Sequence, residues 1–171
     1  MRNIIGISGW SGSGKTTLIS NLIKFFTEHN NLKVCALKHA HHSFRLDKPG
    51  KDSFKFFEAG ANKVIISSSK QWAIVNRVEE TEPSLEELLE FSQKNIDIII
   101  VEGWKFSEIN KIEVYRKIVG KTLISDKEKN FIAIATDTKE LNLRTKLPIL
   151  NINDTKQIAD FILKYLKINN V

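Results

Sequence analysis

The sequence predicts an α/β fold, in which a mostly parallel β-sheet is flanked by helices and carries an added β-hairpin. Short strand-like apolar runs alternate along the chain with segments of helical periodicity, an order typical of a parallel sheet. The run Asp97–Val101 is almost continuously apolar, which suits a central strand buried on both faces. Two β-rich runs surround a polar turn between Lys63 and Val78, which predicts a hairpin at the edge of the sheet.

The first half of the chain is expected to begin with a strand, a turn and a helix. Asn3–Ser8 is a short apolar run, and Lys15–Glu28 has apolar residues at the spacing of an amphipathic helix. Leu32–Leu37 is the second expected strand. Asp52–Ala59 is expected to be a short helix that Asp52 begins as an acidic cap.

The second half continues the alternation. A capping box at residues 84–87 predicts the start of a helix before the strand Asp97–Val101. The runs "KIEVYR" and "FIAIA" are expected strands. Asp154 and Gln157 are the expected cap of a last amphipathic helix.

Length and composition predict a single domain that spans residues 1–171, with the hairpin as an extension at about 62–78. Of the 171 residues, 42% are hydrophobic and 27% charged, enough to build one core. The opening apolar run is too short for a signal peptide and no segment is long enough to cross a membrane, so we expect a cytoplasmic protein without membrane contact. The single Cys35 excludes a disulfide within the chain and is expected to be a core residue.

The positive charge indicates anionic ligands. The net charge is +6, and 21 of the 26 basic residues are lysines scattered along the chain. A nucleic-acid surface would show a basic stripe with interleaved aromatic residues, so we do not expect nucleic-acid binding. Phosphorylated small molecules or an acidic partner are favoured.

The stretch "GWSGSGKT", Gly9–Thr16, matches the phosphate-binding loop G-x-x-x-x-G-K-[ST] between an expected strand and an expected helix. Backbone N–H groups of such a loop surround a phosphate, Lys15 reaches the β- and γ-phosphates, and the Thr16 hydroxyl binds Mg²⁺. Thr17 is expected to point elsewhere and to pack, although it adjoins the loop. The expected nucleotide-binding residues here are Gly9, Trp10, Ser11, Gly12, Ser13, Gly14, Lys15, Thr16 and Thr17. The motif makes the fold one of the P-loop NTPase type.

Glu102 is the expected acidic partner of the magnesium ion. Ligands in open α/β sheets bind outside the carboxyl ends of the strands, and Glu102 ends the strand that Asp97 begins. Lys15 and Glu102 are thus the candidate catalytic pair. The alternative is that Glu102 is a surface glutamate at the start of a loop.

The stretch "LKHAHHSFRLDKPGKDSF", Leu37–Phe54, gathers ionisable residues after the second strand. If that strand lies beside the one that feeds the phosphate loop, its end faces the nucleotide. The expected site residues are Lys38, His39 and Lys51 for the nucleotide, and Asp47 and Asp52 for the Mg²⁺ shell. The alternatives are that Asp52 only caps a helix, that the lysines are solvated, and that His41 and His42 are surface residues. A zinc site at His39, His41 and His42 is a further alternative, although their spacing matches no common zinc pattern.

Two classes of phosphate-loop protein remain open. Small-molecule kinases of this type close an arginine-rich lid over the transferred group, and the five arginines of this chain form no R-x-x-R cluster. The guanine motif [NT]-K-x-D has only a poor match, "NKIE" at 110–113. The residues alone therefore leave two functions open. One is a GTP-binding accessory protein, and the other is a kinase or efficient NTPase that acts on a phosphorylated metabolite.

Four blocks of the sequence resemble one family. "GISGWSGSGKTTLI", "LKHAHHSFRLDKPGKDSFKFFEAGA", "DIIIVEGWK" and "KIEVYR" are similar, in this order and over about residues 3–137, to the molybdopterin-guanine dinucleotide biosynthesis adaptor proteins, the MobB family. The second block is the most specific of the four. The sequence departs from the family pattern in its plain carboxyl-terminal part and in Trp10, a bulky residue that nothing in the loop motif requires.

The resemblance implies a homodimeric GTP-binding protein with weak turnover at most. It implies that the protein assists the guanylyltransferase that joins GMP to molybdopterin, with Mg²⁺ as cofactor and molybdopterin as bound substrate or cargo. It also implies that the β-rich extension makes dimer contacts. Asp137, just after "FIAIAT", is the candidate for recognising guanine, because a carboxylate accepts hydrogen bonds from the guanine ring N–H and amine.

Overall fold

The computed structural model describes residues 3–40, 48–78, 81–92, 94–138 and 146–168. The chain divides into two compact units, one made of residues 1–39 and 85–171 and the other of residues 40–84. The second unit is longer than the hairpin extension expected at 62–78. That the chain behaves as one domain stays a prediction.

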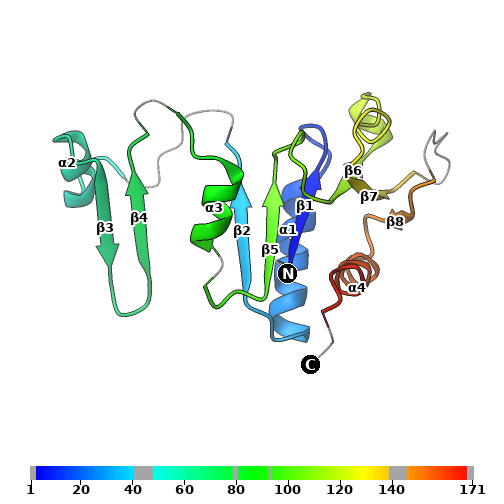
Figure 1. Ribbon diagram of the computed structural model, residues 1–171, viewed down its shortest axis with the longest axis horizontal. Coiled ribbons are helices and arrows are strands. Elements are labelled where there is room, and N and C mark those ends of the chain that lie inside the picture. Colours follow the sequence, from blue (N-terminus) through cyan, green and yellow to red (C-terminus); the bar gives the residue numbers. More distant parts are fainter. Residues whose placement is uncertain (1–2, 41–47, 79–80, 93, 139–145, 169–171) are drawn as a thin grey trace. The chain divides into compact units, whose positions relative to one another are not determined.

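The first unit is built on a six-stranded parallel sheet (Figure 1). Its strand order is β2-β5-β1-β6-β7-β8. The bounds are β1 Ile4–Ser8, β2 Val34–Lys38, β5 Ile98–Glu102, β6 Lys111–Tyr115, β7 Phe131–Thr136 and β8 Ile149–Asn151. The predicted strands are confirmed within two residues, while the three-residue β8 was not predicted because its run is too short to show a period.

Two helices cover one face of this sheet and a third covers the other. Helices α1 (Lys15–His29) and α4 (Thr155–Leu166) pack on one core, and α3 (Leu85–Ser92) packs on the opposite face of β5. Alternate residues of β5 enter the two cores, with Ile100 in the first and Val101 in the second. This confirms that β5 is an interior strand buried on both faces.

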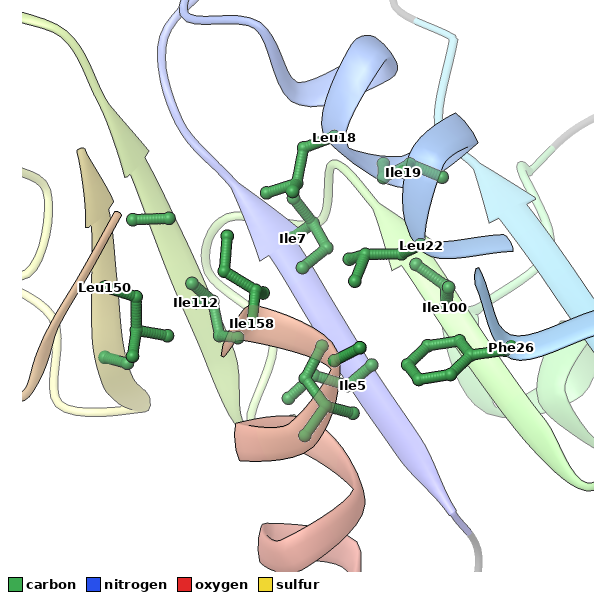
Figure 2. Close-up of a cluster of buried hydrophobic side chains, with 14 of the residues drawn as sticks. Ile5, Ile7, Leu18, Ile19, Leu22, Phe26, Ile100, Ile112, Leu150 and Ile158 are labelled. Atoms are coloured by element: carbon green, nitrogen blue, oxygen red, sulfur yellow. The ribbon is translucent and has the colours of Figure 1, made fainter. Parts of the chain in front are cut away.

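The larger core lies between the sheet and the two helices α1 and α4. Figure 2 shows that side chains of α1 meet those of β1 and β5, while α4 adds Ile158 beside Ile112 of β6. The expected apolar stripe of α1 is present, since Leu22 and Phe26 are fully buried. Helix α4 begins as predicted, because the Asp154 carboxylate accepts a hydrogen bond from the Gln157 backbone N–H at 2.9 Å.

The connection from β5 to β6 contains no helix. Residues 103–110 return the chain to the start of a strand that is parallel to β5, and Trp104 and Ile109 pack against the smaller core on the way. Lys111 begins β6 with only 1% of its surface exposed. Its ammonium donates hydrogen bonds to the carbonyl oxygens of Ser107 and, at 2.9 Å, of Ile109.

The loop after β6 is held by a buried carboxylate. Glu113 is fully buried in β6 and accepts hydrogen bonds from the backbone N–H groups of Ile124 at 2.7 Å and Ser125 at 2.9 Å. A buried carboxylate is stable when backbone donors replace its water. Glu113 therefore ties Ile124 and Ser125, in the connection after β6, to the sheet.

The second unit contains helix α2 (Asp52–Glu58) and the antiparallel hairpin of β3 (Lys63–Ser67) and β4 (Trp72–Asn76). The hairpin is confirmed, but β3 and β4 form a separate two-stranded sheet and do not extend the edge of the parallel sheet. Ile65 and Trp72 are more than 60% exposed on it. Among the helices that the structure describes, none is both long and apolar enough to cross a membrane.

Candidate functional site

The phosphate loop lies between β1 and α1 as predicted. Gly14 is the N-cap of α1 and has φ 95°, which a residue with a side chain rarely adopts. A Cβ on Gly9 would lie 2.4 Å from the Val114 carbonyl oxygen, so only glycine fits against β6. Ser11 and Gly12 are exposed, and Ser13 is buried. The loop therefore has the turn that the motif requires, with its middle open to solvent.

Lys15 is positioned at the inner side of the loop. Its ammonium donates a hydrogen bond to the Trp10 carbonyl oxygen at 3.0 Å. Burial lowers the pKa of Lys15; the nearby Glu102 opposes this effect, and Lys105 and Lys38 add to it. A partly buried ammonium with one bond and two cationic neighbours is well suited to an anion.

Glu102 faces the phosphate loop from the end of β5. The Thr16 hydroxyl lies 3.5 Å from Glu102 Oε1, and the Lys38 ammonium lies 3.8 Å from Oε2. The Glu102 side chain is only 15% exposed. A hydroxyl and a carboxylate oxygen are the hard ligands that Mg²⁺ prefers, so Thr16 and Glu102 fit the predicted metal position. Thr17 is exposed at the first turn of α1, so the expectation that it is a packing residue was wrong.

The end of β2 reaches this site by a different route from the one expected. β2 pairs with β5 and not with β1, so β5 separates it from the strand that feeds the phosphate loop. The register Lys38↔Glu102 nevertheless places Lys38 next to the carboxylate. His39 follows and stacks on Trp104, with the ring centroids 4.8 Å apart. His39 also lies close to Gly103, because a Cβ added to Gly103 would be only 2.8 Å from the Cβ of His39.

The remaining predicted residues of the stretch are not part of the first unit. Lys51 and Asp52 are exposed in the second unit, and Asp47, His41 and His42 lie outside the described residues. Asp52 is the first helical residue of α2, whose N-cap is Lys51, so the expectation that Asp52 caps the helix was wrong. Its carboxylate pairs instead with Lys55 at 3.1 Å. Within the described part of the chain, no group of three or more His, Cys, Asp or Glu side chains gathers as metal ligands.

Sequence reasoning missed two features on the β6 side of the loop. Arg116, directly after β6, pairs with Asp137 at 3.3 Å and lies against Gly14. Trp10, which no motif explains, donates its indole N–H to the Thr122 carbonyl at 2.8 Å and so ties the phosphate loop to the loop that Glu113 holds.

Two lysines also lie near the Trp10 ring. The ammonium of Lys105 is 4.6 Å from the ring centroid, and that of Lys121 is 6.0 Å away. The position of Arg116 at a strand end was the only signal in the sequence for any of these contacts.

Comparisons with known proteins agree on one family. The family model described as "MobB: Molybdopterin guanine dinucleotide synthesis protein B" matches residues 4–137. A molybdopterin-guanine dinucleotide biosynthesis adapter protein of Escherichia coli (strain K12) is 36% identical, over 98% of this chain and 95% of the relative. One from Haemophilus influenzae is 39% identical, over 95% of this chain and 89% of the relative.

Solved structures show the same fold. The crystal structure of Bacillus subtilis MobB superposes with a TM-score of 0.74 at 28% identity, covering 97% of this chain and 99% of that one. A MobB homolog from Bacillus stearothermophilus gives a TM-score of 0.75 at 17% identity, covering 98% and 99% of the two chains. At that identity the second match supports the fold alone.

Proposed function

The chain belongs to the MobB family, with a role in molybdenum cofactor biosynthesis, and from this we propose that it is a GTP-binding adapter that assists the attachment of GMP to molybdopterin. The observation that carries the proposal is the phosphate loop of a family member, in which Lys15 and Thr16 face Glu102. These groups match the charges of a magnesium-bound triphosphate.

In this proposal the loop residues 9–17 hold the phosphates through their backbone N–H groups, and Lys15 exchanges the Trp10 carbonyl for a phosphate oxygen. Thr16 and Glu102 would hold Mg²⁺, which neutralises phosphate charge when bound. Lys38 and His39, at the end of β2, are assigned to the same ligand. That Lys51 contacts it and that Asp47 and Asp52 serve the metal stays a prediction from the sequence.

The guanine preference is supported by the names of the relatives, which refer to molybdopterin-guanine dinucleotide, a compound with a guanine nucleotide. The partners proposed are therefore GTP, molybdopterin and the guanylyltransferase that joins them, in the cytoplasm. Asp137 directly follows β7, and one of its carboxylate oxygens is already paired with Arg116. Any contact with the base would have to share or replace that pair.

The adapter is proposed to have weak GTPase activity at most. The alternative of a kinase or efficient NTPase is not favoured, because the family comparisons support a role in cofactor synthesis. In the described residues, Arg116 is the arginine that approaches the phosphate loop, whereas arginine-lid kinases use several.

Competition binding of GTP and ATP with Mg²⁺, combined with steady-state phosphate release, tests this function. We expect GTP to bind more tightly than ATP and phosphate release to stay slow when a small-molecule acceptor is added. Equal affinities would refute the guanine preference, and fast acceptor-dependent release would favour a kinase. Glu102→Gln should weaken the Mg²⁺ dependence of binding, whereas Asp160→Asn, which removes an exposed carboxylate paired with Lys156 on α4, should not.

A homodimer is also proposed, with the hairpin as the contact surface. Ile65, Ile66 and Trp72 are exposed on β3 and β4, and among the described residues each of these strands pairs only with the other, which leaves one edge of each for pairing. Sedimentation should give a dimer for the parent and a monomer for Ile65→Lys. A monomeric parent would refute the homodimer. A variant that still dimerises would show that the hairpin is not the contact surface.

A further inference from the structure

Arg116 is brought to the phosphate loop by the strand register. β6 pairs with both β1 and β7, and the last pair of the β6–β7 ladder is Tyr115↔Thr136. The next residues, Arg116 and Asp137, therefore leave the sheet side by side. Their side chains meet at 3.3 Å, between Arg116 Nη1 and Asp137 Oδ2, and both are about one-third exposed.

The other side of the guanidinium faces the start of α1. A Cβ placed on Gly14 would lie 3.6 Å from Arg116 Nε and 3.9 Å from Nη2, so the guanidinium lies against the residue that precedes Lys15. Nε is buried and has no hydrogen-bond partner among the described residues. A buried donor without an acceptor costs free energy, and such groups in native proteins usually have a role.

We propose that Arg116 is a further phosphate-binding residue of the nucleotide site and that Asp137 is the residue that positions it, an inference that rests on the proposed nucleotide binding. The fork of an arginine binds phosphate oxygens through two parallel N–H groups. The pair with Asp137 holds Nη1 and leaves Nε and Nη2 on the side of Gly14, where the phosphate loop ends. The nucleotide thus meets Lys15 from the loop, Lys38 from the β2 side and Arg116 from the β6 side.

This role separates Asp137 from guanine recognition. A residue that acts through Arg116 affects every triphosphate equally, whatever its base. A residue that contacts guanine changes the ratio of GTP to ATP affinity and leaves a ligand without a base unaffected. If the Arg116–Asp137 pair only joins the ends of β6 and β7, its removal changes the stability of the protein and leaves the affinity for every ligand unchanged.

The test measures the affinities of GTP, ATP and inorganic tripolyphosphate, each with Mg²⁺, together with thermal unfolding. We expect Arg116→Gln to weaken all three by the same factor, about 10- to 100-fold. Arg116→Lys, which keeps the charge and loses Nε, should recover part of the loss. Asp137→Asn should weaken all three by a smaller common factor. Asp160→Asn, the control for an exposed ion pair, should change none.

Two results would overturn the proposal, and a comparison with Lys15→Ala separates its failure from that of nucleotide binding. Parental affinities in folded Arg116→Gln and Arg116→Lys would exclude a phosphate contact. A changed ratio of GTP to ATP in Asp137→Asn would make Asp137 a base-recognising residue. If the parent binds none of the three ligands, the proposed nucleotide binding itself fails; tight binding that Lys15→Ala abolishes and Arg116→Gln does not would refute the Arg116 role alone.

Discussion

Two lysines in the first unit have their pKa lowered by burial, but they differ in what surrounds the ammonium. Lys111, at the start of β6, donates to two backbone carbonyls of the β5–β6 connection, and Glu128 partly offsets the effect of burial. Lys15, at the start of α1, donates to one carbonyl and has Lys105 and Lys38 as neighbours. The Lys111 ammonium is thus bound by backbone groups of the protein, while the Lys15 ammonium has N–H groups left to donate to a ligand.

The difference teaches how to separate a structural lysine from a ligand-binding one. Gly6 of β1 leaves room for the Lys111 side chain, since a Cβ there would lie 2.5 Å from Lys111 Cγ. The chain is thus adapted around Lys111. Lys15 instead lies in a loop whose middle is exposed and whose cations repel one another. Such an arrangement lowers stability without a ligand and favours an anion.

The largest expected effect is the loss of nucleotide binding in Lys15→Ala. The ammonium is expected to contact phosphate and contributes nothing to the core, so triphosphate affinity should fall by at least about 100-fold while unfolding stays nearly unchanged. Calorimetric titration with Mg²⁺–GTP measures the affinity. Lys24→Ala removes an exposed lysine from the same helix and should bind as the parent does. A folded Lys15→Ala protein with parental affinity would remove the basis of the site.

The second expected effect is on stability. Lys111→Met keeps the apolar stem and removes the ammonium, so the Ile109 carbonyl loses this donor and the Ser107 carbonyl keeps only the Asn130 amide at 3.4 Å; the free energy of unfolding should fall by about 1–3 kcal/mol. Urea denaturation measures this, and Mg²⁺–GTP affinity should not change. Weaker nucleotide binding without lost stability would show that Lys111 is not the structural member of the pair.

The smallest expected effect is a pH dependence that distinguishes the two lysines. The folded pKa of each lies below the unfolded value of 10.5, so between these values the unfolded chain binds more protons and stability rises with pH. Triphosphate affinity, in contrast, should fall a few-fold as the pH rises through the folded pKa of Lys15, which loses its charge there. Lys111→Met should show the same affinity profile. An affinity that stays constant up to pH 10.5 would contradict the role of Lys15.

The sequence was sufficient for features that depend on contiguous residues. The phosphate loop, the amphipathic helix after it and the buried strand that ends at Glu102 follow from local pattern, because each is set by the spacing of neighbouring residues. The family could also be identified, since its blocks keep their order along the chain.

Features that depend on which strands are neighbours were predicted poorly. The insertion of β5 between β2 and β1 reflects long-range packing, so the route of Lys38 to Glu102 was misjudged although the contact exists. The meeting of Arg116 and Asp137 depends on the β6–β7 register, which no local pattern specifies. Asp52 was misjudged because a helix can begin one residue earlier than its acidic residue suggests.

The indole of Trp10 gives the phosphate loop an optical signal of its own. Its ring has the Lys105 and Lys121 ammonium groups within 6.0 Å of its centroid, and the emission of an indole responds to the charges beside it. A triphosphate that draws these cations away would change that emission. The other two tryptophans lie in different surroundings, since Trp104 stacks on His39 and Trp72 is exposed on the hairpin of the second unit. Fluorescence from variants that keep one tryptophan each would therefore follow the phosphate loop, the end of β5 and the hairpin separately.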